Sequence, residues 1–145
     1  MPRKFLPAMK RKGIGTVVNI TSVASRIVWP GAAAYTAVRW AMAGFTESLR
    51  AELYWTDINV ALAMFGSVRS PYWEHNPGSL ERLPRIARMA RMITAETAAE
   101  AIVRAVEKNK RLGLRPHIFR FIFLLNSLFP SSMERMMCQT GWKSE

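Results

Sequence analysis

The sequence offers very little cysteine or histidine chemistry. Cys138 is the one cysteine among 145 residues, so the chain cannot form an internal disulfide. Its two histidines, His75 and His117, lie far apart in the sequence. A zinc site needs a cluster of such ligands, which this chain lacks. We therefore expect a reducing, cytoplasmic setting, and we interpret His75 and Cys138 as structural residues.

Long apolar runs and glycine-rich phosphate loops are also missing. No segment reaches the ~18 apolar residues that span a bilayer, and the basic amino terminus has no apolar run of signal-peptide length. Neither G-x-G-x-x-G nor G-x-x-x-x-G-K occurs. Gly13 and Gly15 precede a predicted strand, whereas a dinucleotide-binding fingerprint follows one. We predict neither export nor a membrane span, and no nucleotide-binding motif can be found.

Acidic residues are scarce relative to basic ones. Ten Asp and Glu oppose 21 Lys and Arg, which gives a net charge of +11 at pH 7. Such an excess can indicate nucleic acid, an anionic membrane or an anionic ligand. The basic residues are spread along the chain, and in the middle they recur every third residue, at Arg82, Arg85, Arg88 and Arg91. Because no nucleic-acid-binding signature accompanies them, we interpret the charge as solvated and predict no nucleic-acid partner.

The apolar pattern predicts alternating strands and helices. Residues 15–21 (GTVVNIT) and 58–65 (INVALAMF) are short apolar or β-branched runs that indicate buried strands. A helical periodicity covers about 33–54, and Thr94 can cap a second helix that ends near residue 109. The sequence LGL at 112–114 suits a third short strand. This order is typical of parallel α/β units with crossover helices.

A serine, a tyrosine and an arginine are placed at set distances around the first strand and helix. NITS ends the strand with Ser22, Tyr35 follows thirteen residues later, and Arg39 follows Tyr35 by four. The helix continues as AMAGFTESLRAEL, and INVALAMFGSVRS and ITAETAAEAIVRAV come after it. Together these segments resemble the short-chain dehydrogenase/reductase family, over the carboxyl-terminal half of its domain. The family's glycine motif, Asn-Ala-Gly segment and helix asparagine would precede Met1.

The resemblance implies an α/β fold. We expect a Rossmann-like doubly wound parallel sheet that is incomplete, with the amino-terminal nucleotide-binding half missing, because such sheets usually hold more than three strands. Residues 1–145 would form one partial domain. We expect the end of a helix and a turn at 1–14, a catalytic core at 15–115 with a substrate loop at about 67–93, and an apolar and basic extension at 116–145.

The resemblance also implies hydride transfer between NAD or NADP and a small-molecule carbonyl or secondary alcohol. Transfer to a carbonyl leaves an alkoxide, which needs a general acid and a polarising donor. Tyr35 would be the acid and Ser22 the donor. Residues four apart share a helix face, so Arg39 would place a positive charge beside the phenol. The family has a lysine there that also holds the nicotinamide ribose, and arginine is bulkier and planar, so activity becomes uncertain.

A second part of the predicted site follows the strand at 58–65. FGSVRS occupies the place of the family's Pro-Gly-x-x-x-Thr segment, so Phe65 replaces the proline, Gly66 lets backbone approach a cofactor amide, and Ser70 can replace the threonine hydroxyl. The predicted cofactor-binding residues are Tyr35, Arg39, Phe65, Gly66, Val68 and Ser70. We do not expect this chain to bind the dinucleotide tightly, because the glycine motif that cradles its pyrophosphate is absent.

Two segments could each contact a partner, which would be a second copy of the chain or a membrane. The helix at about 33–54 carries a stripe of small residues, which suits close packing on its own sheet or against a twin helix in a homo-oligomer: Ala37, Ala41, Gly44, Ser48 and Ala51. Residues 117–129 place apolar side chains at helical steps, which suits a membrane interface, the core or a lid over the substrate. An oxidoreductase fragment, a non-catalytic dimerisation subunit and a basic peripheral membrane protein are therefore the three functions considered.

Overall fold

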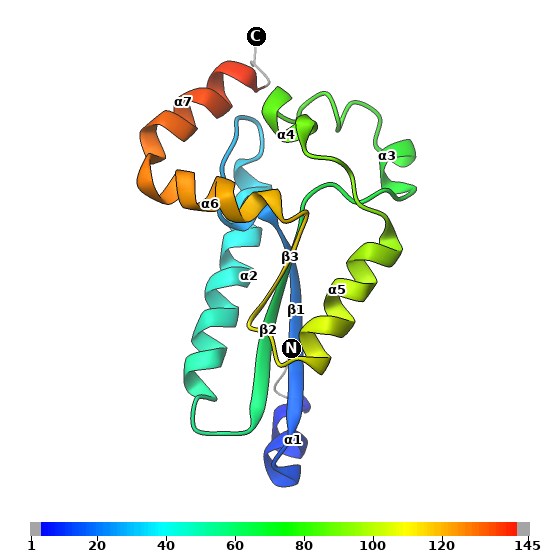
Figure 1. Cartoon of the computed structure of the whole chain (residues 1–145), viewed down its shortest axis with the longest axis vertical. Helices are drawn as coiled ribbons and strands as arrows, with labels where there is room; N and C mark the ends of the chain where they lie inside the picture. Colours follow the sequence, from blue (N-terminus) through cyan, green and yellow to red (C-terminus); the bar gives the residue numbers. More distant parts are fainter. Residues whose placement is uncertain (1–3, 142–145) are drawn as a thin grey trace.

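The computed structural model describes residues 4–141, which form a three-stranded parallel sheet with helices on both sides (Figure 1). The helices are α1 (Leu6–Lys12), the 3-10 helix η2 (Val23–Ser25), α2 (Ala33–Glu52), α3 (Tyr72–His75), α4 (Arg85–Met89), α5 (Ala95–Glu107), α6 (Ile118–Leu128) and α7 (Pro130–Thr140). The strands are β1 (Gly15–Ser22), β2 (Ile58–Phe65) and β3 (Leu112–Arg115).

The strands lie in the order β1-β2-β3, so β2 is paired on both edges. Gly15 pairs with Ile58 and Ser22 with Phe65, while Leu62 pairs with Leu112. Nearly all of β2 is buried, which explains why its sequence is apolar at every position except the partly buried Asn59. The carboxyl ends of β1 and β2 therefore meet at one edge of the sheet.

The two crossover helices cover opposite faces of the sheet. Leu62 and Met64 of β2 belong to a buried cluster with Ala43 of α2. The alternate residues Ala63 and Phe65 belong to another cluster on the side of α5. Figure 1 shows the sheet between α2 and α5. The predicted Rossmann-like doubly wound arrangement is confirmed.

Polar residues attach α2 to the sheet. Its buried side includes Thr36 and Thr46. Asn19 of β1 donates a hydrogen bond to Thr46 Oγ1 at 3.0 Å, and Thr46 in turn donates to the carbonyl oxygen of Met42 at 2.7 Å. The small-residue stripe of α2 is exposed, as are Val38 (62%) and Phe45 (44%). The stripe therefore does not pack on its own sheet.

The carboxyl-terminal segment forms two helices, of which the sequence analysis identified only the apolar part at 117–129. Phe119 of α6 is buried, and Met133 and Met137 of α7 join the same cluster. The opposite side of α6 is exposed and apolar, at Ile118, Phe121, Leu124, Leu128 and the adjoining Phe129. The segment thus contributes to the core and also leaves an apolar surface uncovered.

Candidate functional site

Ser22 is the last residue of β1, and the turn that follows it uses its side chain. Its Oγ accepts a hydrogen bond from the backbone N–H of Ala24 at 3.2 Å, which caps η2. Its carbonyl oxygen accepts a hydrogen bond from Ser25 Oγ at 2.7 Å. A hydroxyl that accepts one bond still has its own hydrogen to donate. Ser22 is therefore held at the end of the strand with its O–H available.

Tyr35 and Arg39 lie together on the first turns of α2. The guanidinium carbon of Arg39 is 4.7 Å from the centroid of the Tyr35 ring and lies over its face. Trp29, from the loop before α2, contacts the tyrosine at a centroid distance of 6.4 Å. The tyrosine is 44% exposed. The predicted pair of phenol and cation is thus brought into contact.

A hydrogen bond joins the start of α2 to the end of β1. Thr21 Oγ1 donates to the carbonyl oxygen of Arg39 at 3.3 Å, and Thr21 immediately precedes Ser22. The Nε atom of Arg39 is buried and has no hydrogen-bond partner in the part of the chain that the structure describes. The turn that bears Tyr35 and Arg39 therefore lies against the strand end that bears Ser22.

The segment after β2 begins beside Ser22, since Ser22 and Phe65 are register partners. Phe65 is buried towards α5, and the N–H of Gly66 donates to the carbonyl oxygen of Arg115 at 3.0 Å. Val68 forms a parallel bridge with Ile93, and its carbonyl oxygen accepts from Trp73 Nε1 at 2.7 Å. Ser70 is partly buried at the beginning of α3. Hydrogen bonds to its own backbone groups therefore hold the segment from Gly66 to Val68 in place.

Phe119 of α6 is a site neighbour that sequence reasoning did not identify. A Cβ atom added at Gly66 would lie 2.8 Å from Cε2 of Phe119 and 3.3 Å from Cδ of Pro116. Gly66 is therefore required by the packing of α6. The apolar steps at 117–129 left a membrane interface, the core and a lid over the substrate open, and no local pattern pointed to Phe119 as the neighbour of Gly66.

The arrangement fits part of a nicotinamide cofactor. In open parallel sheets, ligands bind outside the carboxyl ends of the strands, where Ser22, Tyr35 and Gly66 lie. The buried, unpartnered Nε of Arg39 is a donor that a ligand oxygen could satisfy. The side of Gly66 that Phe119 covers cannot also admit a cofactor. Within residues 4–141, the chain fits the nicotinamide end and presents no glycine-rich turn for the pyrophosphate.

Other features of the described residues bear on the range of functions. Residues 4–141 contain no cluster of His, Cys, Asp or Glu that could hold a metal ion. None of the helices in that range is long and apolar enough to cross a bilayer. Near α6, burial and the charges of Arg115, Arg120 and Lys110 lower the pKa of His117. A cavity of about 340 Å³ exists elsewhere, and none of Ser22, Tyr35 and Arg39 lines it.

Comparisons with known proteins identify the family of the chain. The sequence profile of the short chain dehydrogenase family matches residues 1–78, which is more than half of the chain. A dehydrogenase/reductase SDR family protein 7-like from Anopheles gambiae is 30% identical over 140 residues, which cover 90% of this chain and 42% of the relative. The chain therefore spans less than half the length of that relative.

Solved structures share the fold. A short chain dehydrogenase from Burkholderia cenocepacia, in complex with NADP, superimposes with a TM-score of 0.73 at 22% identity, covering 92% of this chain and 51% of the other. A short-chain dehydrogenase from Sphingobium yanoikuyae, in complex with NADPH, gives a TM-score of 0.65 at 18% identity, covering 88% and 48%. Profile, relative and fold agree, and this chain belongs to the short-chain dehydrogenase family.

Proposed function

We propose that this chain carries the catalytic residues of an NAD(P)-dependent oxidoreductase that interconverts a carbonyl compound and a secondary alcohol. The observation that carries the proposal is the Arg39 guanidinium over the Tyr35 ring, on a helix turn bonded to the strand that ends at Ser22. A proton donor, a cation and a hydroxyl at the carboxyl ends of parallel strands are what carbonyl reduction needs.

In the proposed reaction, Tyr35 transfers the proton. When bound, the nicotinamide cofactor supplies the hydride to the carbonyl carbon, or accepts it in the reverse direction. The Tyr35 hydroxyl gives its proton to the substrate oxygen as the carbonyl bond opens. Arg39 stabilises the phenolate that remains, since its charge lies over the ring. In alcohol oxidation Tyr35 takes the proton back.

Ser22 holds the substrate oxygen in this proposal. Its Oγ accepts from Ala24 N–H, which orients the hydroxyl and increases its ability to donate. A hydrogen bond from Ser22 to the carbonyl oxygen would polarise the bond and would strengthen as negative charge develops. Because η2 fixes the serine, the donor needs little reorganisation.

The residues after β2 would contact the cofactor. Phe65 ends β2 beside Ser22, and Gly66, Val68 and Ser70 lie in the segment that follows it. The N–H of Gly66 and the carbonyl of Val68 already have partners, so they serve mainly to shape the segment. Ser70 supplies a hydroxyl that no recorded bond uses within residues 4–141. We propose that Ser70 and the Arg39 side chain make the polar contacts to the nicotinamide riboside.

The test supplies an amino-terminal half from a relative. The chain is joined to that half of a relative with the glycine-rich motif, and NADH and NADPH absorbance is followed with a panel of ketones and secondary alcohols. Tyr35→Phe should abolish turnover. Tyr54→Phe, which changes an exposed tyrosine just beyond the other end of α2, should leave turnover unchanged. Equal activity of the Tyr35→Phe and unchanged proteins would overturn the proposal.

A second candidate function is that of a non-catalytic dimerisation subunit, and the exposed face of α2 favours it. The small-residue stripe from Ala37 to Ala51 faces away from the sheet, with Val38 and Phe45 beside it. Small residues allow two helix backbones to approach closely. We propose that this face pairs with the same face of a second copy, whether or not the site is active.

The exposed side of α6 supports a membrane contact as a further proposal. Apolar side chains at Phe121, Leu124 and Leu128 are more than half exposed, the exposed Arg120 lies on the same helix, and Arg115 ends the strand before it. Apolar and basic groups together suit the surface of an anionic bilayer. We propose a cytoplasmic protein with peripheral contact to membranes, which cell fractionation with and without high salt would test.

A further inference from the structure

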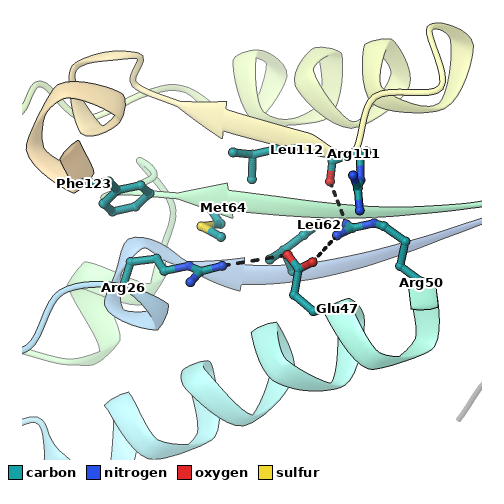
Figure 2. Close-up of a pocket in the computed structure, with 8 residues that line it drawn as sticks. All are labelled: Arg26, Glu47, Arg50, Leu62, Met64, Arg111, Leu112 and Phe123. Carbon is teal, nitrogen blue, oxygen red and sulfur yellow. Dashed lines mark hydrogen bonds and ion pairs between the residues drawn. The ribbon is translucent and has the colours of Figure 1, made fainter. Parts of the chain in front are cut away.

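A cavity with an apolar floor and a charged rim lies between α2, the sheet and α6 (Figure 2). Its volume is about 340 Å³. The apolar residues that line it are Leu62, Met64, Leu112 and Phe123, and the charged residues are Arg26, Glu47, Arg50 and Arg111. At ~1.5 Å of rise per helical residue, Glu47 is about 18 Å along α2 from Tyr35. None of Ser22, Tyr35 and Arg39 is among the residues that line the cavity, so it is distinct from the candidate catalytic site.

The charges around the cavity do not cancel. Three arginines face one glutamate, so the lining has a net charge of +2. Arg26 and Arg50 both pair with the single carboxylate of Glu47. Arg111 forms no recorded ion pair within residues 4–141. An anion that entered the cavity would therefore meet an excess of positive charge.

Arg50 is fixed in place by the sheet. Its Nε donates to the carbonyl oxygen of Val60 at 3.0 Å, and one terminal nitrogen donates to the carbonyl oxygen of Arg111 at 3.1 Å. The other terminal nitrogen pairs with Glu47. The side chain is only 13% exposed. Its guanidinium is therefore a rigid, partly desolvated charge, which is the kind that strengthens anion binding.

The other two arginines are freer to meet a ligand. Arg26 pairs with Glu47 at 3.8 Å, a distance at the outer limit of a salt bridge, and its side chain is half exposed. Arg111 is exposed, and Arg50 contacts its backbone carbonyl oxygen and not its guanidinium group. Figure 2 shows Arg26 on one side of Glu47, and Arg50 and Arg111 on the other. Both guanidinium groups can turn towards an anion without breaking a buried contact.

We propose that this cavity binds an organic monocarboxylate with an apolar body. A guanidinium group matches the planar geometry of a carboxylate and can bind it through two parallel hydrogen bonds. The apolar body would cover Leu112 and Phe123, which an inorganic anion would leave in contact with water. A volume of about 340 Å³ is within the range of small-molecule sites. The ligand carboxylate would bind at Arg111, with Arg26 and Arg50 adding attraction.

The test is calorimetric titration of the 145-residue chain with sodium octanoate at low ionic strength. Saturable binding is expected, and Arg111→Gln should weaken it at least tenfold. Arg26→Gln should weaken it less, because that side chain is shared with Glu47. Arg104→Gln, on α5 across the sheet, is the matched control and should leave the affinity unchanged. Circular dichroism of each variant shows that the fold is retained.

Ligand controls separate charge from apolar contact. Octanol has the same tail without the charge, and acetate has the charge without the tail, so both should bind much more weakly than octanoate. No saturable octanoate binding at millimolar concentration would overturn the proposal. Equal binding by octanol, or full affinity in Arg111→Gln, would also overturn it. Because no turnover is measured, the result is independent of the proposed oxidoreductase activity.

Discussion

The guanidinium carbon of Arg39 lies 4.7 Å from the centre of the Tyr35 ring. The two residues are one helical turn apart on α2. A cation over an aromatic face contributes about 0.5–1 kcal/mol at an exposed site. The ring itself therefore helps to hold the charge beside the phenol. The family lysine is a compact point charge with a flexible stem, whereas the arginine presents a plane. Charge and shape can thus be tested separately at this position.

We expect Arg39→Lys to raise kcat/KM at least tenfold in the chain joined to the amino-terminal half of a relative. A tenfold change corresponds to ~1.4 kcal/mol of transition-state stabilisation. The reason is that ribose binding depends on the shape of the side chain, and the guanidinium is larger. Steady-state kinetics with varied cofactor concentration measure the change, and Arg104→Lys is the control. Unchanged or lower kcat/KM would mean that arginine is the adapted residue.

The 145-residue chain by itself should not bind NADH or NADPH saturably at micromolar concentrations. Binding of a dinucleotide depends strongly on backbone N–H groups that cradle the pyrophosphate at a helix start after a glycine-rich turn. The measurement is a titration followed by cofactor fluorescence. A saturable curve with micromolar affinity would contradict the expectation and would place the pyrophosphate on other residues.

Gly66→Ala should destabilise the fold by about 1–3 kcal/mol, the usual cost of forcing an extra methyl group into a packed core. The new Cβ would lie 2.8 Å from the ring of Phe119. Gly44→Ala is the matched control: no atom lies within 4 Å of its added Cβ, and it is inside α2. That change should stabilise the fold by up to ~1 kcal/mol. Urea unfolding measures both, and equal effects of the two substitutions would be inconsistent with this account.

Ala41→Glu should reduce self-association of the chain. It places a charge in the middle of the exposed stripe of α2, where a second helix is proposed to pack. Ala95→Glu, at the exposed start of α5, adds the same charge at a position favourable to the helix dipole. Sedimentation velocity over a range of concentrations compares the two. If Ala41→Glu sediments like the unchanged chain, α2 is not the interface.

His117 should titrate below its ordinary pKa of 6.5, because burial and the charges of Arg115, Arg120 and Lys110 disfavour its cationic form. The neutral form is favoured in the folded state, so its contribution to stability is complete above 6.5 and is lost as pH falls through the lowered pKa. NMR titration of the imidazole measures the midpoint. Arg120→Gln should raise it, and His75→Gln should not. A midpoint at or above 6.5 would show that burial and the charges of Arg115, Arg120 and Lys110 do not lower the pKa of His117.

Strand β2 was predictable because burial on both faces favours apolar residues at nearly every position. The run from Ile58 to Phe65 is apolar at every position except Asn59, since β2 is covered by α2 and α5. The helix α5 was predictable from Thr94, whose Oγ1 accepts from Thr97 N–H at 3.2 Å. Burial of a strand and capping of a helix both act on residues that are close in the sequence, so a short segment is enough to predict them.

Other features depend on partners distant in the sequence. Periodicity alone does not show which side of α2 is buried, because Thr36 and Thr46 face the sheet and Asn19 satisfies Thr46. Helix α7 was missed because Met133 and Met137 are its only fully buried residues. The contact of Gly66 with Phe119, and the cavity that joins Arg26, Arg50 and Arg111, require the folded chain.

The parallel pairing of the three strands has a consequence for how the chain folds. Gly15 pairs with Ile58 across η2 and α2, and Leu62 pairs with Leu112 across α3, α4 and α5, so both pairings join residues far apart in the sequence. No strand can find its partner through a short hairpin, and contacts between distant residues form slowly. We expect α2 and α5 to form before the sheet does, while the edges of β1 and β2 remain open. While β2 is still on the ribosome, β1 lacks this partner strand, and the edge of β1 that pairs with β2 stays open.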